Sequence, residues 1–180
     1  GPKRAAGPAR GNPVPGGGAR GPVSNGRQVA NIDRIVGESV NAGAEIRAGG
    51  RHEGLFYFPT VLAGVTQQMP AFREEIFGPV APVTVVKDEE EAIAVANDTE
   101  YGLVAAIQTG STSHGLEIAR RLNTGIVHVN DQTLNNDAYA PFGGTGASGN
   151  GSRYGSQSSW DEFTSWQWLT SRQQAHGFPF

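Results

Sequence analysis

The sequence predicts an α/β fold built on a mainly parallel sheet. Short runs rich in β-branched residues alternate with amphipathic segments of about ten residues, and glycine- or proline-containing turns separate them. Helices of that length between strands form crossover connections, which join parallel strands. The chain also contains no internal repeat, so a solenoid or propeller is not expected.

The first predicted helix begins at Ser24, which can cap it, and ends at residues 41–43, Asn-Ala-Gly. Its apolar residues recur close to every 3.6 positions: Val29, Ile32, Ile35, Val36 and Val40. Residues 44–48 predict a short strand that a Gly-Gly pair closes. Residues 56–65 predict extended chain interrupted by Pro59.

The middle of the chain predicts a strand, a helix and a second strand. Residues 80–86 form an apolar run typical of a buried strand. Asp88 followed by Glu91 approximates a capping box and predicts that a helix opens over residues 89–96. Residues 104–109 predict the next strand.

The last third predicts one more crossover and an aromatic strand. A helix is expected over residues 113–122, with these side chains facing inward: Leu116, Ile118, Ala119 and Leu122. A strand over residues 126–130 and a long polar, glycine-rich loop over residues 131–155 follow. Residues 162–170 alternate and are aromatic, which predicts a final strand.

Composition excludes several classes of function. Basic and acidic residues number 14 and 17, so no electrostatic footprint for nucleic acid or an anionic membrane is expected. No apolar run is long enough to span a membrane, and no signal peptide is evident. The sequence contains no cysteine, which excludes disulfides, thiolate metal sites and a thiol nucleophile within it. A cytoplasmic protein is expected.

Composition also divides the chain into three parts. Residues 1–22 are almost entirely Gly, Pro, Ala and Arg, and are expected to form a disordered leader rather than a basic binding tail. The main domain is expected over residues 23–158, and a C-terminal strand and tail over residues 159–180. Because the first residue is glycine and the only methionine is Met69, we expect a fragment, a processed or tagged chain, or a frameshifted gene.

Three features of the sequence have both a functional and a structural explanation. Residues 144–149 match G-x-G-x-x-G, but no strand ends directly before them and no helix can open on them, so a dinucleotide fingerprint is not expected. His128 lies in a predicted strand and is expected to be a hydrogen-bonded structural residue. The pair Glu74-Glu75, followed by Ile-Phe-Gly-Pro-Val, is on composition alone better explained as a capped turn with exposed acids.

That acidic segment resembles a motif of the aldehyde dehydrogenase superfamily, and other segments agree with the family in order and spacing. They are Gly-Pro-Val at 21–23, Pro-Thr-Val-Leu at 59–62, Ala-Asn followed by Tyr-Gly-Leu at 96–103, Gly-Ile-Val-His-Val-Asn at 125–130, and Pro-Phe-Gly-Gly followed by Ser-Gly at 141–149. The segments Val-His-Val-Asn-Asp-Gln-Thr at 127–133, Gly-Asn-Gly-Ser-Arg-Tyr-Gly at 149–155 and Phe-Thr-Ser-Trp-Gln-Trp at 163–168 most resemble the benzaldehyde and vanillin dehydrogenase branch. Many family members have Arg-Glu where this chain has Ser152-Arg153, so no ion pair is carried over there.

The resemblance implies roles for four residues. Glu75 matches a glutamate that accepts hydrogen bonds from the nicotinamide ribose hydroxyls of NAD or NADP, and Phe77 matches an aromatic beside that ribose. Phe142 matches an aromatic of the aldehyde tunnel, and Asn136 lies near another tunnel position. Residues 163–170 resemble the strand through which subunits associate, which implies a homo-oligomer.

The resemblance also implies a reaction that this sequence cannot perform alone. In the family a cysteine thiolate attacks the aldehyde, hydride passes to the nicotinamide, and a glutamate-activated water hydrolyses the thioester. This chain has no cysteine, and the dinucleotide-binding segment lies upstream of the region it matches. We therefore expect a fragment of an NAD(P)-dependent aldehyde dehydrogenase that is inactive alone. The alternative is a non-catalytic subunit that associates with full-length relatives.

Overall fold

The computed structural model describes residues 21–175 and 177 of the 180-residue chain. It divides into two compact units, Gly1–Thr99 and Glu100–Phe180, and each is described by itself. Nearly all of the predicted disordered leader, residues 1–20, lies outside the described residues.

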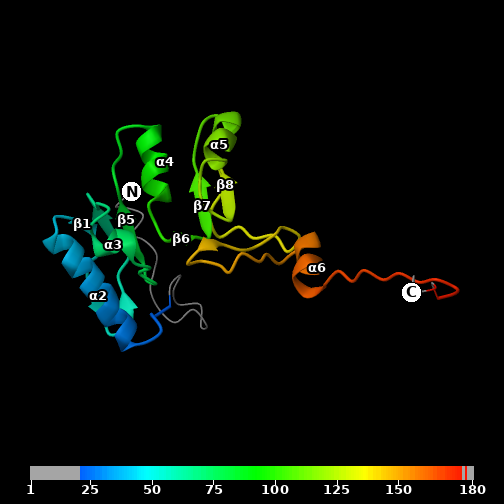
Figure 1. Ribbon diagram of the computed structural model, residues 1–180. Helices are drawn as coiled ribbons and strands as arrows, with labels where there is room; N and C mark the ends of the chain where they lie inside the picture. Colours follow the sequence, from blue (N-terminus) through cyan, green and yellow to red (C-terminus); the bar gives the residue numbers. More distant parts are fainter. Residues whose placement is uncertain (1–20, 176, 178–180) are drawn as a thin grey trace. The chain divides into compact units, whose positions relative to one another are not determined.

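The described part of the first unit contains a three-stranded sheet, a two-stranded hairpin and three helices (Figure 1). In chain order the elements are α2 (Gly26–Asn41), β1 (Glu45–Ala48), β2 (His52–Glu53), β3 (Phe56–Tyr57), β4 (Thr60–Ala63), α3 (Pro70–Arg73), β5 (Val80–Val83) and α4 (Glu89–Asn97). The sheet order is β1-β4-β5, in which β4 pairs antiparallel with β1 and parallel with β5. The hairpin pairs β2 with β3.

Helix α2 supplies one side of the core of this unit. The predicted apolar periodicity is confirmed, since Val29, Ile32, Ile35 and Val36 are all buried. They pack with these residues of the chain between β3 and β5: Tyr57, Leu62, Val65, Met69, Ala71 and Ile76. The predicted cap is wrong by one residue. Asn25, in extended conformation, accepts a hydrogen bond from the Gln28 N–H at 3.0 Å and so caps the helix in place of Ser24.

Strand β5 differs from its prediction as a buried strand. It lies at the edge of the sheet order, paired with β4 alone among the described strands, and all of it after Val80 is exposed. Beyond it, Val85 is 84% exposed. An apolar run indicates burial only if another layer covers it, and the described part of the chain supplies none here.

The second unit contains the predicted crossover. Its elements are β6 (Tyr101–Gly102), β7 (Val104–Ile107), α5 (Thr112–Ala119), β8 (Ile126–Val129), β9 (Thr145–Gly146) and α6 (Gln157–Phe163). Strands β7 and β8 are parallel and α5 connects them, whereas β6 and β9 are antiparallel. The α/β class is therefore confirmed, but the sheets are mixed rather than mainly parallel.

The inward face of α5 was only partly predicted. Ile118, Ala119 and Leu122 are half-buried, but Leu116 is 46% exposed. The buried residue of this helix is Gly115, where a Cβ would lie 2.5 Å from Val129 Cγ1. The glycine lets α5 approach β8 closely, which a count of large apolar residues cannot reveal.

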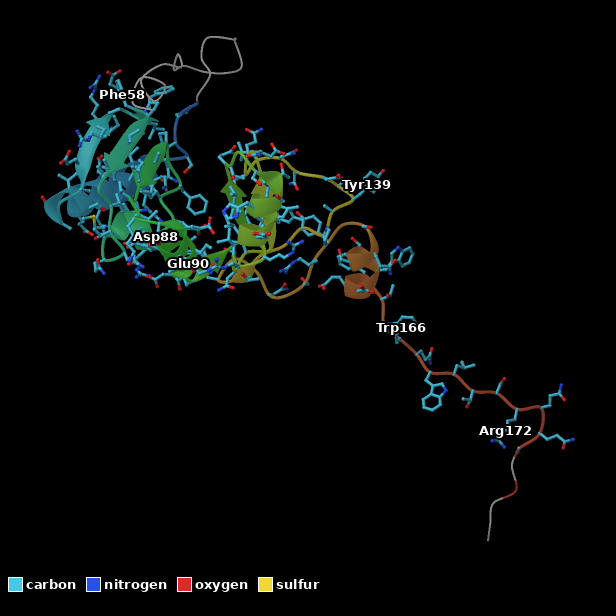
Figure 2. The ribbon with its side chains drawn as sticks, turned by 90° about the horizontal axis from the view of Figure 1, so that it is seen from above. Phe58, Asp88, Glu90, Tyr139, Trp166 and Arg172 are labelled. Carbon is cyan, nitrogen blue, oxygen red and sulfur yellow. The ribbon has the colours of Figure 1, made fainter. Side chains whose placement is uncertain are left out.

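The predicted strand at residues 162–170 is wrong. Glu162 belongs to α6, and the chain then continues as an extended segment without strand pairing in the described region. Figure 2 shows this segment beyond α6, with Trp166 and Arg172 along it. An alternating pattern requires a neighbouring strand to become a ladder, and these residues have none here.

Candidate functional site

Two neighbouring carboxylates, Glu74 and Glu75, follow α3 and have different surroundings. Arg34 on α2 binds both oxygens of Glu74, with N–O distances of 3.2 and 2.6 Å, and the Glu74 carboxylate raises the pKa of that guanidinium. Glu75 is exposed and makes no hydrogen bond or ion pair with any described residue. Glu74 thus has an ion pair with α2, whereas Glu75 is an exposed acid, as the capped-turn explanation also expects.

Helix α2 also holds the residues that follow. The Gln28 side-chain amide donates to the carbonyl oxygens of Ile76 at 2.8 Å and Phe77 at 3.2 Å. Phe77 has a φ of 47°, a left-handed conformation that is costly for an aromatic residue. Its ring is 75% exposed, while the neighbouring Ile76 is buried in the core. The turn is thus anchored from inside and presents Glu75 and Phe77 outward.

The arrangement suits the binding of a ribose ring. A carboxylate offers two acceptors to the two donors of a ribose diol, and an exposed ring can pack against the sugar. Glu75 and Phe77 have that chemistry on one short, held segment of the first unit. The two predicted cofactor residues lie close together because they are only two positions apart in the chain. Hydrogen bonds from Gln28 on α2 fix the backbone at residues 76 and 77.

The two predicted substrate residues, Asn136 and Phe142, both line a cavity of about 420 Å³ in the second unit, and both also line a second cavity of about 260 Å³. The other lining residues of the larger cavity are Gly125, Ile126, His128, Asn135, Asp137, Ala138, Ala140 and Pro141. Phe142 and Tyr154 exchange backbone hydrogen bonds of 2.8 and 3.0 Å, and their rings lie 5.0 Å apart. This bridge holds the aromatic wall of the cavity in place.

The cavity loop is stabilised by Asp131. Its carboxylate accepts hydrogen bonds from the Asn135 side-chain amide at 2.5 Å and from the Gln132 N–H at 2.8 Å. These donors lower the pKa of Asp131 below its usual value. The start of the loop is therefore ordered by its own polar residues, and Asn136 follows directly.

His128 lines the same cavity, and the expectation that it is hydrogen-bonded is wrong at its Nε2 atom. It was expected to be a hydrogen-bonded structural residue, but its Nε2 atom is buried without a hydrogen-bond partner among the described residues. The signal that could have revealed this was position. His128 alternates with Val129 on β8, and the long loop passes over the face of β8 opposite to α5.

Other candidate motifs remain structural. The glycine loop at residues 144–149 forms β9 and tight turns, and the next helix begins only at Gln157, so the context of a dinucleotide fingerprint is missing. Over residues 21–175 and 177, no three His, Cys, Asp or Glu side chains gather closely enough to hold a metal ion. None of the helices in that range has the length and hydrophobicity needed to cross a bilayer.

The comparisons with known sequences agree with the resemblance. The model of the aldehyde dehydrogenase family matches residues 3–169. A benzaldehyde dehydrogenase [NAD(+)] of Pseudomonas putida is 47% identical over 160 residues, which are 89% of this chain and 33% of that protein. A vanillin dehydrogenase of Amycolatopsis sp. is 46% identical over 171 residues, or 94% of this chain and 35% of that protein.

Solved structures give the same result. A salicylaldehyde dehydrogenase from Pseudomonas putida G7, complexed with salicylaldehyde, matches with a TM-score of 0.90 and 31% identity over 99% of this chain and 37% of that one. An aldehyde dehydrogenase from Brucella melitensis biovar abortus 2308 matches with a TM-score of 0.79 and 37% identity, covering 86% of this chain and 32% of that one. The chain thus spans about a third of the length of the relatives it matches.

Proposed function

The chain belongs to the aldehyde dehydrogenase family, and we propose that it forms part of an NAD(P)-dependent enzyme that oxidises an aromatic aldehyde to the carboxylic acid. The observation that carries the proposal is the unpartnered, exposed Glu75 beside the exposed ring of Phe77, on a turn held by Gln28. Its neighbour Glu74 is engaged in an ion pair with Arg34, whereas Glu75 and Phe77 are exposed to solvent.

In the proposed enzyme, Glu75 accepts hydrogen bonds from the nicotinamide ribose and Phe77 packs beside that sugar. The bound cofactor supplies the hydride acceptor. The task of these residues is to orient the sugar, and the Gln28 hydrogen bonds keep their backbone from relaxing. Structures of NADP complexes exist among family members similar to this chain, and the choice between NAD and NADP stays open.

On the aldehyde side, we assign Phe142 and Asn136 to the substrate. The ring of Phe142 provides an aromatic wall, and Asn136 provides a side-chain amide at the same cavity. Three of the relatives are named for benzaldehyde, vanillin and salicylaldehyde, all of which are aromatic aldehydes. Phe142→Ala should therefore weaken handling of the aldehyde and leave that of the cofactor unchanged.

The nucleophile is not among these 180 residues, since the sequence has no cysteine. The chain alone should therefore show no dehydrogenase activity with benzaldehyde and NAD, in protein freed of host dehydrogenases. To test the function itself, the N-terminal part of the Pseudomonas putida benzaldehyde dehydrogenase would be joined to residues 23–180. We expect this fusion protein to reduce NAD or NADP with an aromatic aldehyde. A folded but inactive fusion protein would contradict the proposal.

A second candidate is a non-catalytic subunit that associates with full-length relatives. The exposed aromatic segment after α6, where Trp166 is 102% and Trp168 92% exposed, favours association with another chain. Tagged chain expressed beside an intact relative would co-purify with it in a fixed ratio under this alternative. A cytoplasmic location and a homo-oligomer of the complete enzyme are part of the main proposal, and they rest on composition and on the exposed segment.

A further inference from the structure

Two asparagines of the sequence are followed by a glycine, at Asn25-Gly26 and at Asn150-Gly151. This pair of residues allows a reaction within the chain, because the backbone nitrogen of the glycine can attack the side-chain carbonyl carbon of the asparagine and close a five-membered succinimide ring. Glycine permits the attack since it has no Cβ to obstruct the approach or to restrict the backbone. Which of the two sites reacts depends on how the fold holds each asparagine.

The Asn150-Gly151 pair lies in an exposed bend between β9 and α6. Gly151 has a φ of 96°, and nothing lies within 4 Å of the position that a Cβ would occupy. Its N–H, which belongs to the attacking nitrogen, donates a backbone hydrogen bond to no other described residue. No backbone hydrogen bond of Gly151 and no packed neighbour in the described chain therefore opposes ring closure at this pair.

Ser152 supplies two donors to the carbonyl group that would react. Its N–H and its hydroxyl group donate to the Oδ1 atom of Asn150 at 3.0 and 2.7 Å. Attack at the carbonyl carbon transfers negative charge to this oxygen, and donors that are already in place stabilise such a charge as it develops. The two hydrogen bonds from Ser152 therefore favour the tetrahedral intermediate that precedes the succinimide.

Asn25 is held in a different way, as the cap of α2. Its side chain accepts a hydrogen bond from the Gln28 N–H at 3.0 Å, and its backbone carbonyl accepts one from the Val29 N–H at 3.3 Å. Gly26 is the first residue of the helix, so ring closure would have to pull it out of helical conformation. That change would open the first turn of α2 next to the buried Val29. The fold therefore opposes the reaction at Asn25.

We propose that Asn150 is a site of spontaneous deamidation, to which the fold directs the reaction in preference to Asn25. The Gly151 nitrogen forms a bond to the Asn150 Cγ atom, and its proton passes through water to Nδ2, which leaves as ammonia when the Cγ–Nδ2 bond breaks. Water then opens the succinimide at either of its carbonyl carbons. One opening gives aspartate at position 150, and the other gives isoaspartate, in which the main chain runs through the side-chain carbons. No atom is oxidised or reduced, and water is the only other reactant.

The product differs from the original loop in charge and in length. Deamidation adds one negative charge, and isoaspartate also adds one atom to the path of the main chain. Tyr154 follows a few residues later, and its backbone exchanges hydrogen bonds with Phe142 in the cavity wall. The modified residue thus lies in the segment that leads to this wall. The reaction needs only the chain and water, so it does not depend on the proposed function.

Incubation of the folded 180-residue chain at mildly alkaline pH tests the proposal. Trypsin separates the two sites into the peptides 21–27 and 122–153, and fragment mass spectra locate each conversion of an amide to an acid. We expect conversion at Asn150, as a mixture of aspartate and isoaspartate, at a rate about tenfold above that at Asn25. In a chain unfolded by urea the two rates should become similar, because neither pair is then held.

Two variants of the loop and one control sharpen the test. Ser152→Ala removes the hydroxyl donor and should slow conversion at Asn150 about threefold in the folded chain. Ser113→Ala, which changes an exposed serine on α5, should leave the rate unaltered. Asn150→Gln should abolish conversion at position 150, since closure would require a larger ring. A rate at Asn150 no higher than that at Asn25 in the folded chain would overturn the proposal, and so would a rate in Ser152→Ala equal to or above that of the unaltered chain.

Discussion

At the scale of single residues, function and structure divide between adjacent side chains. Glu74 and Glu75 have the same chemistry and sit one position apart, yet only Glu74 is bound by Arg34. The division follows from the turn after α3, because consecutive residues in extended chain point in opposite directions. One carboxylate then faces α2 and the other faces solvent, which leaves Glu75 available to a ligand.

Replacing each of these glutamates tests that division. In the fusion protein, Glu75→Gln should raise KM for the cofactor, by a loss of about 1–3 kcal/mol of charge-assisted hydrogen bonding to the ribose. Glu74→Gln should lower the melting temperature and leave cofactor KM nearly unchanged. Steady-state kinetics with varied NAD or NADP, alongside thermal melts, would measure both. Unchanged cofactor kinetics in Glu75→Gln would remove this residue from the cofactor site.

Asp98 gives a pH-dependent prediction. It accepts hydrogen bonds from Arg73 at 2.8 Å and from Gln67 at 2.7 Å, and chiefly the Arg73 bond lowers its pKa below the ordinary 3.8. A lowered folded-state pKa contributes stability that is present above 3.8 and is lost as the pH falls through the folded value. Asp98→Asn should therefore lower the melting temperature at pH 6, and the difference should shrink below pH 3.8.

The control for this measurement is Asp161→Asn in α6, since Asp161 is exposed and forms no ion pair with the described residues. Asp161→Asn should change the melting temperature little, both at pH 6 and below pH 3.8. If the melting temperature of Asp98→Asn stayed equally far below that of the unaltered chain in acid, the charge of the Asp98 carboxylate would have no part in the difference.

At the scale of elements, α2 contributes to the core of the first unit and also holds the turn that carries Glu75 and Phe77. Its apolar face forms the core, while Gln28 and Arg34 hold the segment that begins at Glu74. Gly78 completes this contact, because a Cβ there would lie 2.4 Å from Ile32 Cδ1. Glycine at position 78 therefore serves the close packing of α2 as well as the turn.

Two glycine substitutions test that packing. Gly78→Ala should destabilise the chain by about 1–3 kcal/mol, because the new methyl group overlaps Ile32 in the core. Gly37→Ala, inside α2 with nothing within 4 Å, should stabilise it by about 0.5–1 kcal/mol through helix propensity. Urea unfolding followed by circular dichroism measures both. Similar stabilities for the two variants would contradict the close approach of α2 to Gly78.

Elements with strong local signals were predicted from sequence. The apolar period of α2, the Asp88 cap of α4 and the β7-α5-β8 crossover are all present. In α4 the Glu91 carboxylate accepts from the Lys87 N–H rather than from the cap residue itself, a small departure from a capping box.

Elements that depend on distant partners were not predicted. The exposure of β5, the exposed side of Leu116 and the missing strand after Glu162 all depend on what covers or pairs a segment, which a local pattern does not encode. For the same reason, the position of His128 in a cavity lining was not predicted. A histidine in a strand is identified as structural or functional only by what lies across from it, here a cavity rather than a partner.

At the scale of the whole molecule, large apolar side chains remain exposed in both units. Val85 and Leu134 are each 84% exposed, and the densest group lies in and after α6. That group consists of Trp160, Phe163, Trp166, Trp168 and Leu169, each at least 66% exposed. Exposed apolar side chains that gather in one segment are typical of an interface or an aggregation site. The chain spans about a third of its relatives' length.

The isolated chain should therefore self-associate, and the aromatic segment after α6 should dominate the association. Trp166 and Trp168 are almost fully exposed on extended backbone without strand pairing in the described region, so burying them against another copy removes much apolar surface from water (Figure 2). Light scattering at tens of micromolar should report species larger than a monomer. The double variant Trp166→Ser, Trp168→Ser should shift the chain toward monomer. Leu134→Ser should not, because Leu134, which is 84% exposed, lies outside the aromatic segment. A monomeric wild-type chain with a cooperative melt would refute self-association. An equal effect of Leu134→Ser would assign the association to general apolar exposure and remove the aromatic segment from its cause.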